Sequence, residues 1–280
     1  MTPRIAVVTD STAYLPMAQA RAADVTVVPV QVVIGGQSMA ETDVSSADVA
    51  SALKDWTPVS TSRPSPETFI EAYMRAEHEG VTGIVSVHLS GEMSATVESA
   101  ELASKEVSIP VRVVDSRSIG MGLGFPVLAA AQAAQTGADL HVVEQIARDR
   151  CERSTVLFYV DTLEYLRRGG RIGKAAALVG SALSVKPLLH LVDGHVEALE
   201  KVRTSSRALA RLEEIAVEQV GDEAADVAVQ HLANPDRAQA LVTRLQERLG
   251  GAVAVTVGEV GPVVGAHVGP GMIAVAISPR

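Results

Sequence analysis

Hydroxyl side chains crowd the stretch at 60–66, which reads STSRPSP. Ser60, Thr61 and Ser62 stand together, and Ser65 lies between two prolines. An ordinary solvated turn can have this composition. The alternative is a rigid cluster of neutral donors that holds a small anionic group, such as a carboxylate, without a positive charge.

Two further segments carry similar donors. The stretch HLSGEMSAT at 88–96 places Ser90 and Ser94 where an expected strand passes into an expected helix. Open α/β sheets bind ligands beyond the carboxyl ends of their strands, and the free N–H groups of a helix N-terminus favour an anion there. The stretch GAHVGPGM at 265–272 holds His267 in an expected turn before the last strand. Together the three segments could hold one carboxylate, whereas each segment alone is better explained as an ordinary polar turn.

Ser94 and His267 allow a second interpretation, in which the serine is the nucleophile and the histidine the base of a hydrolase or acyltransferase. The sequence contains no G-x-S-x-G nucleophile elbow, and no acidic partner for the histidine stands out. A third interpretation is a nucleotide-binding regulator that uses GMGLGF at 120–125. The glycine spacing there differs from the G-x-G-x-x-G pattern of dinucleotide-binding folds.

The sequence gives no basis for a metal site. Cys151 is the sole cysteine, and none of the seven histidines forms an i, i+4 pair beside a glutamate. Cysteine-rich and paired-histidine metal sites need such spacings. We therefore expect neither a bound metal nor a cofactor.

The elements that must position these residues alternate between strands and helices. Apolar runs rich in β-branched residues predict strands at 4–10, 25–34, 83–89 and 111–116, with helices at 66–79, 94–106 and 125–137. Ser65 is the expected N-cap of the first of these helices and Gly80 its expected end. Continuous apolar strands separated by helices indicate a parallel sheet that is covered on both faces.

The second half predicts a mixed α/β arrangement. Strands are expected at 154–160, 226–232, 253–260 and 272–278, helices around a glycine-rich turn within 161–183, a helix from about 205, and another at 235–250. Asp193 and Gly194 predict a hairpin turn within 186–199. We expect an N-terminal α/β lobe at 1–153 that carries the hydroxyl-rich loops, and a C-terminal α/β lobe at 154–280.

Composition narrows the class of partner. Apolar residues make up 47% of the 280 residues but aromatics only 3%, so small aliphatic side chains form the core and could line a smooth apolar cavity. A formal charge of −9 suits neither a nucleic-acid backbone nor an anionic membrane surface. The sequence has no apolar run of 18 residues or more, and the N-terminus passes straight into a strand-like run. We expect a cytoplasmic protein without stable membrane insertion.

A series of motifs runs along nearly the whole chain. They are VVTDSTAYLP at 7–16, TSRPSP at 61–66, HLSGEMSAT at 88–96, VVDSRSIGMGLG at 113–124, LEYLRRGGRIG at 163–173, KPLL at 186–189 with DG at 193–194, and HVGPG at 267–271. In this order and at this spacing they resemble the DegV family, which includes the fatty-acid-binding subunits of bacterial fatty-acid kinase. The resemblance implies a two-lobed fold in which a long-chain fatty acid fills a tunnel between the lobes.

The resemblance also implies roles for individual residues. Thr61, Ser62, Ser94 and His267 match the family positions that gather around the fatty-acid carboxylate. The chain would then not be a catalyst: it would present the carboxylate to a separate ATP-dependent kinase, which makes an acyl phosphate for phospholipid synthesis. Neutral hydroxyls would stabilise the carboxylate while leaving one oxygen free to accept a phosphoryl group.

Three positions depart from the family pattern. Ala95 replaces a common glycine, Arg63 a frequent glutamine, and Val97 the usual aromatic residue. Ala95 could alter the approach of the backbone to the head group, and Arg63 could face either solvent or the head group.

Basic residues cluster in the stretch LRRGGRIGK at 166–174 of an otherwise acidic chain. A solvated helix face is one interpretation, and the adjacent glycines favour a shaped turn. The resemblance implies that this region docks to the kinase, with Arg168 and Arg171 as the expected contacts. A guanidinium suits bidentate pairing with a phosphate or carboxylate.

Overall fold

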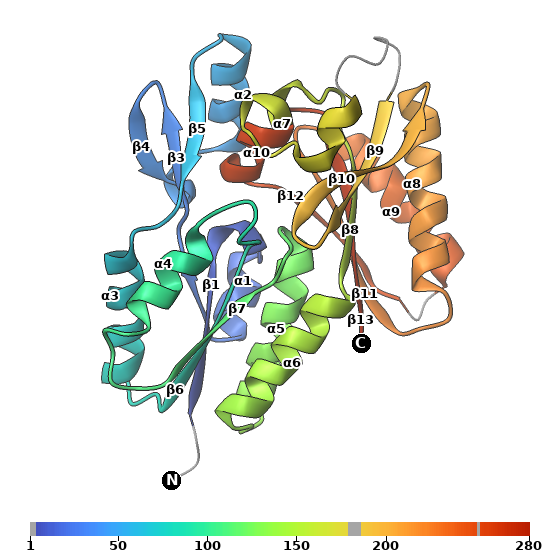
Figure 1. The fold of residues 1–280 in the computed structure, drawn as a ribbon. Coiled ribbons are helices and arrows are strands. Elements are labelled where there is room, and N and C mark those ends of the chain that lie inside the picture. The colour runs from blue at the N-terminus through green and yellow to red at the C-terminus, as the bar shows by residue number, and fades with distance from the viewer. Residues whose placement is uncertain (1–3, 179–185, 251–252) are drawn as a thin grey trace.

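The computed structural model describes residues 4–178, 186–250 and 253–280, and its strands form three sheets (Figure 1). The strand orders are β2-β1-β6-β7, β10-β9-β8-β13-β11-β12 and β4-β3-β5. The first sheet belongs to the N-terminal half and the six-stranded sheet to the C-terminal half. The fold is the two-lobed α/β arrangement that the sequence predicted.

The first sheet is parallel throughout and covered on both faces. Its strands are β1 (Ile5–Asp10), β2 (Val25–Val28), β6 (Gly83–His88) and β7 (Val111–Asp115). Helices α3 (Pro66–His78) and α4 (Thr96–Ala103) bury apolar side chains against one face. Helices α5 (Met121–Gln135) and α6 (Leu140–Arg153) cover the other face, and the short α1 (Met17–Ala22) connects β1 to β2. Both faces are therefore apolar, which explains the nearly continuous hydrophobic runs of these strands.

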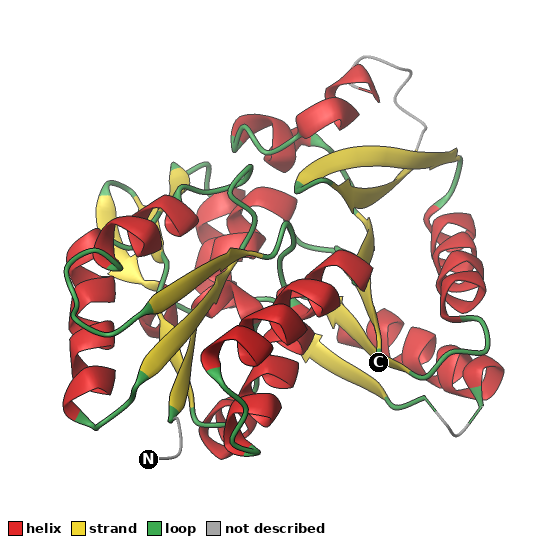
Figure 2. Cartoon of the chain, turned by 60° about the horizontal axis from the view of Figure 1, so that its bottom comes forward, coloured by secondary structure: helices red, strands yellow, loops and turns green. Residues whose placement is uncertain are grey.

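The six-stranded sheet is mixed. Its strands are β8 (Thr155–Tyr159), β9 (Lys186–Val192), β10 (His195–Val202), β11 (Ala225–His231), β12 (Val255–Glu259) and β13 (Ile273–Pro279). All neighbours pair antiparallel except β11 and β12, which are parallel. Helices α8 (Ser205–Val220) and α9 (Pro235–Leu249) pack on the outer face, as Figure 2 shows. Part of the inner face packs against Met121 and Phe125 of α5, and the rest lines the space between the lobes.

The hairpin between β9 and β10 has the predicted turn. Asp193 and Gly194 both have positive φ, 48° and 81°. Two successive left-handed residues give a turn whose twist matches that of the flanking strands. The predicted N-cap is also confirmed, because the Ser65 hydroxyl accepts a hydrogen bond from the Thr68 N–H at the start of α3.

The third sheet was not predicted. It consists of β3 (Gln31–Ile34), β4 (Gln37–Ala40) and β5 (Val59–Ser62), with α2 (Ser46–Lys54) between β4 and β5. The single strand expected at 25–34 was wrong: it divides at Pro29, so that β2 joins the parallel sheet and β3 the small one. Proline has no N–H for a strand ladder, and the next N–H, of Val30, donates to the Ser11 hydroxyl at 3.0 Å.

The small sheet connects the two halves of the chain. Val30 and Val32 pack with Val263 and Ala266 of helix α10 (Pro262–Val268), which lies just before β13. The sequence placed His267 in a turn, but the structure places it in the last turn of this helix. The expected helices around 161–183 are α7 (Glu164–Arg168) and the 3-10 helix η3 (Gly173–Leu178), and the predicted part at 179–183 lies outside the described residues.

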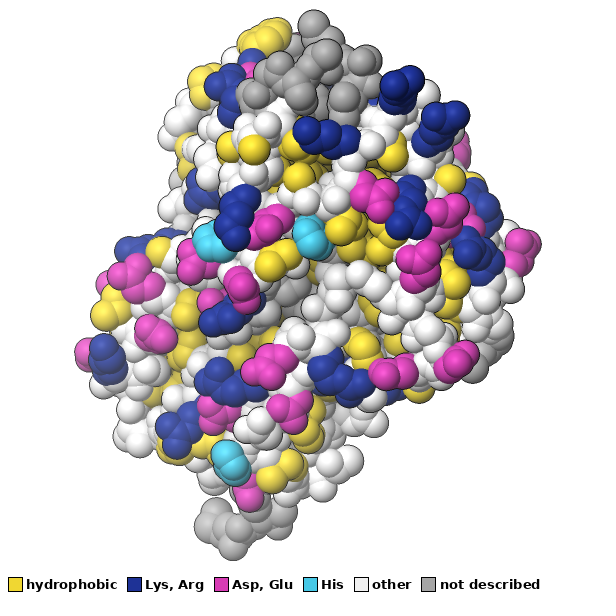
Figure 3. All heavy atoms as spheres, turned by 45° about the vertical axis from the view of Figure 1, so that its right-hand side comes forward, with side chains coloured by type: hydrophobic (Ala, Val, Ile, Leu, Met, Phe, Trp, Pro, Cys, Tyr) yellow, Lys and Arg dark blue, Asp and Glu magenta, His cyan; other side chains and the backbone are white. Residues whose placement is uncertain are grey.

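The surface is charged but mixed. Acidic and basic side chains are interspersed over the face shown in Figure 3. Among the described residues no helix is both long and apolar enough to cross a bilayer.

Candidate functional site

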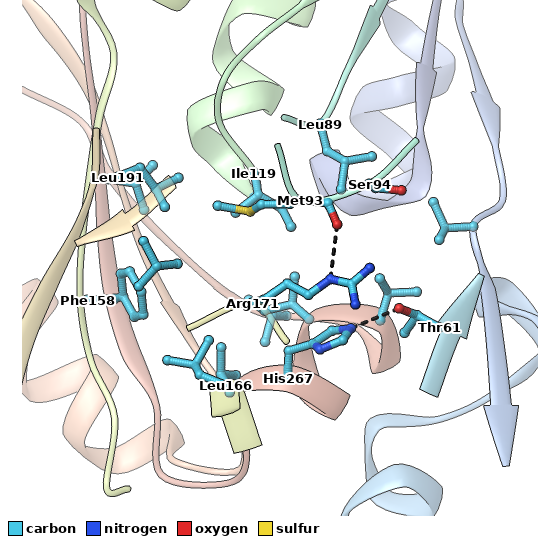
Figure 4. A pocket seen from close by; sticks show the side chains of 18 of the residues that line it. Thr61, Leu89, Met93, Ser94, Ile119, Phe158, Leu166, Arg171, Leu191 and His267 are labelled. Carbon is cyan, nitrogen blue, oxygen red and sulfur yellow. Dashed lines mark hydrogen bonds between the residues drawn. The ribbon is translucent and has the colours of Figure 1, made fainter. Parts of the chain in front are cut away.

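A cavity of about 330 Å³ lies where the two lobes and the small sheet meet (Figure 4). Three parts of the fold supply its walls: the inner face of the six-stranded sheet, the loops after β6 and β7, and the small sheet with α10. The lining residues are Val30, Thr61, Ser62, Arg63, Leu89, Met93, Ser94, Ala95, Ile119, Gly120, Val156, Phe158, Leu166, Arg171, Leu191, Val196, Gln230, Val260, Val263, Val264, His267, Val268, Met272 and Ala274.

Most of the wall is aliphatic. Figure 4 shows Phe158 and Leu191 from the six-stranded sheet facing Ile119 and Leu89 of the first lobe across the cavity. Residues two apart on a strand share one face of the sheet, so Val156 and Phe158 of β8 both line the cavity. Such a lining offers few hydrogen-bond partners to a polar ligand, but it suits a flexible apolar chain.

One end of the cavity is polar, and there the hydroxyl segments meet. The Thr61 hydroxyl lies 2.8 Å from Nε2 of His267, and Ser94 lies across from them (Figure 4). Ser62 follows Thr61 at the end of β5 and lines the same cavity. The structure thus brings all four residues predicted to surround a carboxylate, Thr61, Ser62, Ser94 and His267, to one cavity. Whether they bind a carboxylate remains a prediction.

His267 is held neutral. Burial, and secondly the positive charge of Arg171, lower the pKa of its imidazole to about 4. Its Nδ1 atom is buried, and no described residue supplies it with a hydrogen-bond partner. A Cβ added at Gly169 would overlap this atom, so the imidazole ring fits here because residue 169 has no side chain. The imidazole therefore enters any binding event as a neutral group near pH 7.

The tautomer of His267 decides what Thr61 offers. When Nε2 carries the proton, it donates to the Thr61 oxygen, and the Thr61 hydroxyl hydrogen is free for another acceptor. When Nδ1 carries the proton, the Thr61 hydroxyl donates to Nε2 instead, and a buried N–H lacks an acceptor among the described residues. The first tautomer turns Thr61 into a donor towards the cavity.

Arg171 lies in the cavity wall. Its Nε donates to the Met93 carbonyl at 3.1 Å, and its Nη1 donates to the Gly169 carbonyl at 2.6 Å. The sequence assigned this residue to a docking surface apart from the head-group loops. The structure instead puts its charge beside His267, so the polar end of the cavity contains this cation in addition to the neutral donors (Figure 4).

Arg168 lies outside the lining. It pairs with Glu164 at 2.6 Å, and its guanidinium lies over the ring of Trp56 at 4.7 Å from the centroid. Trp56 is 74% exposed, so this contact links α7 to the loop after α2 at the surface. Lys174 pairs with Glu197 at 2.6 Å. The basic stretch is thus partly neutralised by acidic neighbours, and its docking role remains a prediction.

Arg63 joins two of the loops. Its Nη1 pairs with Glu98 in α4 at 2.6 Å and lies 3.5 Å from the Ala95 carbonyl. The departure from the family pattern at this position therefore places a guanidinium at the cavity rim, where it is already paired with a carboxylate.

Sequence reasoning missed the residues that hold α10 in place. Buried Glu41 accepts hydrogen bonds from the Ser11 hydroxyl, from the Tyr14 hydroxyl at 2.9 Å and from the Val263 N–H at 2.8 Å. The Tyr14 oxygen also accepts from the Val264 N–H at 3.1 Å. Burial raises the pKa of the Glu41 carboxyl despite these donors. The motif VVTDSTAYLP contains two of these residues, Ser11 and Tyr14. Their contacts with α10 could not be predicted from the motif, because that helix lies far along the chain.

The nucleophile interpretation finds no support in the hydrogen bonds. The Ser94 hydroxyl pairs with the Thr96 hydroxyl at 2.9 Å, and Nε2 of His267 pairs with Thr61. Nδ1 of His267, which an acidic partner would orient in a triad, has no carboxylate partner among the described residues.

The glycines of GMGLGF serve close packing. A Cβ at Gly120 would overlap the amide oxygen of Gln230, and one at Gly122 would overlap Val156 and Ser118. A Cβ at Gly124 would lie 2.8 Å from the Ala13 carbonyl oxygen. These contacts fill the start of α5 with protein atoms, where a dinucleotide-binding fold would leave space for a pyrophosphate. Within the described residues, no cluster of three His, Cys, Asp or Glu side chains suits a metal ion.

The comparisons with known proteins agree with one another. A family model described as "Uncharacterised protein, DegV family" matches residues 4–280. A DegV domain-containing protein of Streptomyces coelicolor is 51% identical over 100% of both chains. A DegV family protein from Thermus thermophilus, described by its fatty acid binding, superposes with a TM-score of 0.92 at 32% identity and covers 99% of this chain and 100% of its own. DegV from Bacillus subtilis, described as a fatty acid binding protein, gives 0.90 at 28% identity, with 99% and 100% covered.

Proposed function

The chain belongs to the DegV family, and on this premise we propose that it binds one long-chain fatty acid in the cavity between its lobes. The observation that carries the proposal is the arrangement of the cavity, which is mainly apolar along its length and polar at one end. A fatty acid has the same division between an apolar chain and an anionic head. Solved relatives that are described as fatty-acid-binding share the fold over nearly the whole chain.

The two parts of the ligand contribute differently to affinity. Burying a methylene group contributes about 0.8 kcal/mol, so a chain of roughly fifteen methylenes supplies most of the binding free energy. The head group then fixes orientation. In the proposed complex Thr61, Ser62 and Ser94 donate hydroxyl hydrogen bonds to the carboxylate, and neutral His267 holds Thr61 in the orientation that allows it.

Arg171 gives the head group a counter-charge without enclosing it. Two of its guanidinium nitrogens are already bonded to backbone carbonyls of Met93 and Gly169. These bonds fix its orientation, and an N–H donor remains for the carboxylate or for a phosphoryl group. Arg171 would attract the anion, whereas complete pairing of the carboxylate would remove the oxygen that must react.

We further propose that the chain presents the carboxylate to a separate ATP-dependent kinase. A carboxylate oxygen would attack the γ-phosphorus of ATP and release ADP, and the acyl phosphate formed would enter phospholipid synthesis in the cytoplasm. The chain itself would supply positioning, with lobes at 1–153 and 154–280 on either side of the ligand. Arg168, at the surface, and Arg171, in the cavity wall, are the proposed contacts to the kinase.

The test is a titration of delipidated protein with a fluorescent fatty acid, followed by displacement with an unlabelled one. We expect saturable, reversible binding of about one ligand per chain and no comparable binding of ATP or NAD. Ser94→Ala should reduce transfer of phosphate by a cognate kinase more than it reduces affinity. Saturable nucleotide binding without lipid uptake contradicts the proposal, and loss of an esterase activity in Ser94→Ala would support the hydrolase interpretation instead.

Arg171 variants separate charge from geometry in the kinase step. Arg171→Lys keeps the charge but loses the two-pronged donor pattern, and Arg171→Glu reverses the charge. We expect both to slow phosphate transfer, with Arg171→Glu the slower. Equal rates for all three proteins would remove Arg171 from the proposal.

A further inference from the structure

Gln230 places a polar side chain in the aliphatic part of the cavity. It belongs to β11, is 4% exposed, and lines the cavity together with Phe158 and Ala274. The register puts the three residues in one transverse row, since Gln230 pairs with Ala274 and Ala274 pairs with Phe158. An amide in such a position needs a reason, because burying it without partners is costly.

The orientation of the Gln230 amide is fixed by a donor. The Met121 N–H, at the start of α5, donates to the Gln230 side chain at 2.8 Å. A backbone N–H can only donate, so the atom that it contacts is the amide oxygen Oε1 and the other branch is the NH₂ group. Gly120 leaves room for this contact, since a Cβ there would overlap Oε1.

The NH₂ group has no hydrogen-bond partner in the described part of the chain. Across residues 4–178, 186–250 and 253–280, no atom accepts a hydrogen bond from Nε2 of Gln230. Nε2 is also not among the polar side-chain atoms that are sealed inside the protein without a partner. It is therefore accessible from the cavity that Gln230 lines, and it presents two donors there.

The strand register gives the depth of this donor. Met272 pairs with Leu232, which contacts α10 at Gly265, two residues before His267. The row of Gln230 and Ala274 lies two residues further along the strands, a step of about 6.6–6.8 Å. Val156 lies in the next row beyond it. Gln230 thus stands between the polar end of the cavity and its far wall.

We infer that the cavity prefers fatty acids that carry a hydroxyl or oxo oxygen part-way along the chain, and that the Gln230 amide donates a hydrogen bond to this oxygen. The inference rests on the proposed fatty-acid function and adds a class of ligand to it. An unsubstituted chain lays methylenes against the NH₂ group and leaves it unpaired, whereas an oxygen at the right depth pairs with it. The net gain of one neutral hydrogen bond corresponds to roughly two- to tenfold in affinity.

The experiment is a positional scan by displacement of a fluorescent fatty acid from the delipidated protein. The competitors are octadecanoate, its mid-chain cis-alkene and a series of octadecanoates with a single hydroxyl at successive carbons. We expect a window of mid-chain positions that bind two- to tenfold tighter than their neighbours in the series. A hydroxyl outside the window, against aliphatic wall, should weaken binding.

Gln230→Met assigns the window to the amide. Methionine has a similar length and no donor, so the variant should flatten the window and raise the affinity for unsubstituted octadecanoate. Leu191→Met is the matched control: it changes the shape of the same cavity wall without changing its polar groups, and it should shift all competitors together. The wild-type scan alone decides the matter if Gln230→Met does not fold.

The outcomes separate this inference from the proposed function. If no fatty acid displaces the probe, or none binds, the proposed function fails. If octadecanoate binds but affinity falls equally for every hydroxyl position, or the alkene alone is preferred, only the inference about Gln230 is overturned. A window that persists unchanged in Gln230→Met also overturns it.

Discussion

Acidification should destabilise the ligand-free protein through His267. The pKa of its imidazole is about 4 in the folded chain, against an ordinary value of 6.5. The unfolded chain therefore takes up a proton as the pH falls through 6.5, whereas the folded chain resists until about pH 4. Stability that is present above pH 6.5 is lost between these two values, because protons favour the state that binds them.

The size of the loss follows from the two pKa values. Each pKa unit corresponds to 1.36 kcal/mol, so a shift from 6.5 to about 4 amounts to about 3 kcal/mol in total. About 2.5 kcal/mol of this unfolding free energy is lost as the pH falls from 7.5 to 4.5. Other groups titrate over the same range, among them His190 and His231, whose pKa values are also lowered by burial. A comparison with a variant is needed to isolate His267.

The assay is urea unfolding of delipidated wild type and His267→Gln at pH 7.5 and 4.5. Glutamine keeps a donor and an acceptor for Thr61 but does not titrate. We expect the wild type to lose about 2.5 kcal/mol more than the variant over this interval. A difference below about 1 kcal/mol would refute the claim that the fold holds His267 neutral.

Three further changes test the positioning of the site. Thr61→Val leaves Nε2 of His267 without its partner, so the free energy of unfolding should fall by about 1–3 kcal/mol in urea unfolding at pH 7.5; unchanged stability would contradict the contact. Glu41→Gln puts an NH₂ group against donors that need an acceptor, so the free energy of unfolding should fall by about 1–3 kcal/mol. The fatty-acid affinity measured by displacement should also fall, and an unchanged affinity would mean that Glu41 does not position α10. Gly169→Ala pushes against His267 and should lower fatty-acid affinity, whereas Gly170→Ala, at a φ of 69° with open space around it, should cost about 1 kcal/mol of stability and leave affinity intact. Equal affinities for the two alanine variants would contradict the role given to Gly169.

The sequence predicted those parts of the fold that local patterns determine. The apolar runs of β1, β6 and β7 and the cap at Ser65 depend on neighbours within a few residues, and the Asp193-Gly194 turn depends on two. The small sheet escaped prediction because each of its strands has only four residues, and Val32 alone among these residues is buried. Short strands of this kind acquire stability from what they pack against.

The helix α10 shows why the rest of the site could not be read from the chain. Its sequence is interrupted by glycine and flanked by proline, which favours a turn. Tertiary partners override this preference: Glu41 and Tyr14 supply acceptors for the N–H groups of Val263 and Val264, more than 200 residues away. The same reasoning applies to Arg171, whose place beside His267 depends on how α7 and α10 pack.

Native mass spectrometry of the purified protein, followed by extraction and identification of the bound lipid, tests fatty-acid binding most directly. We expect a mass increment of one fatty acid per chain that disappears on delipidation and returns on incubation with a long-chain fatty acid. A chain that carries no lipid and takes up none, although folded, would contradict it.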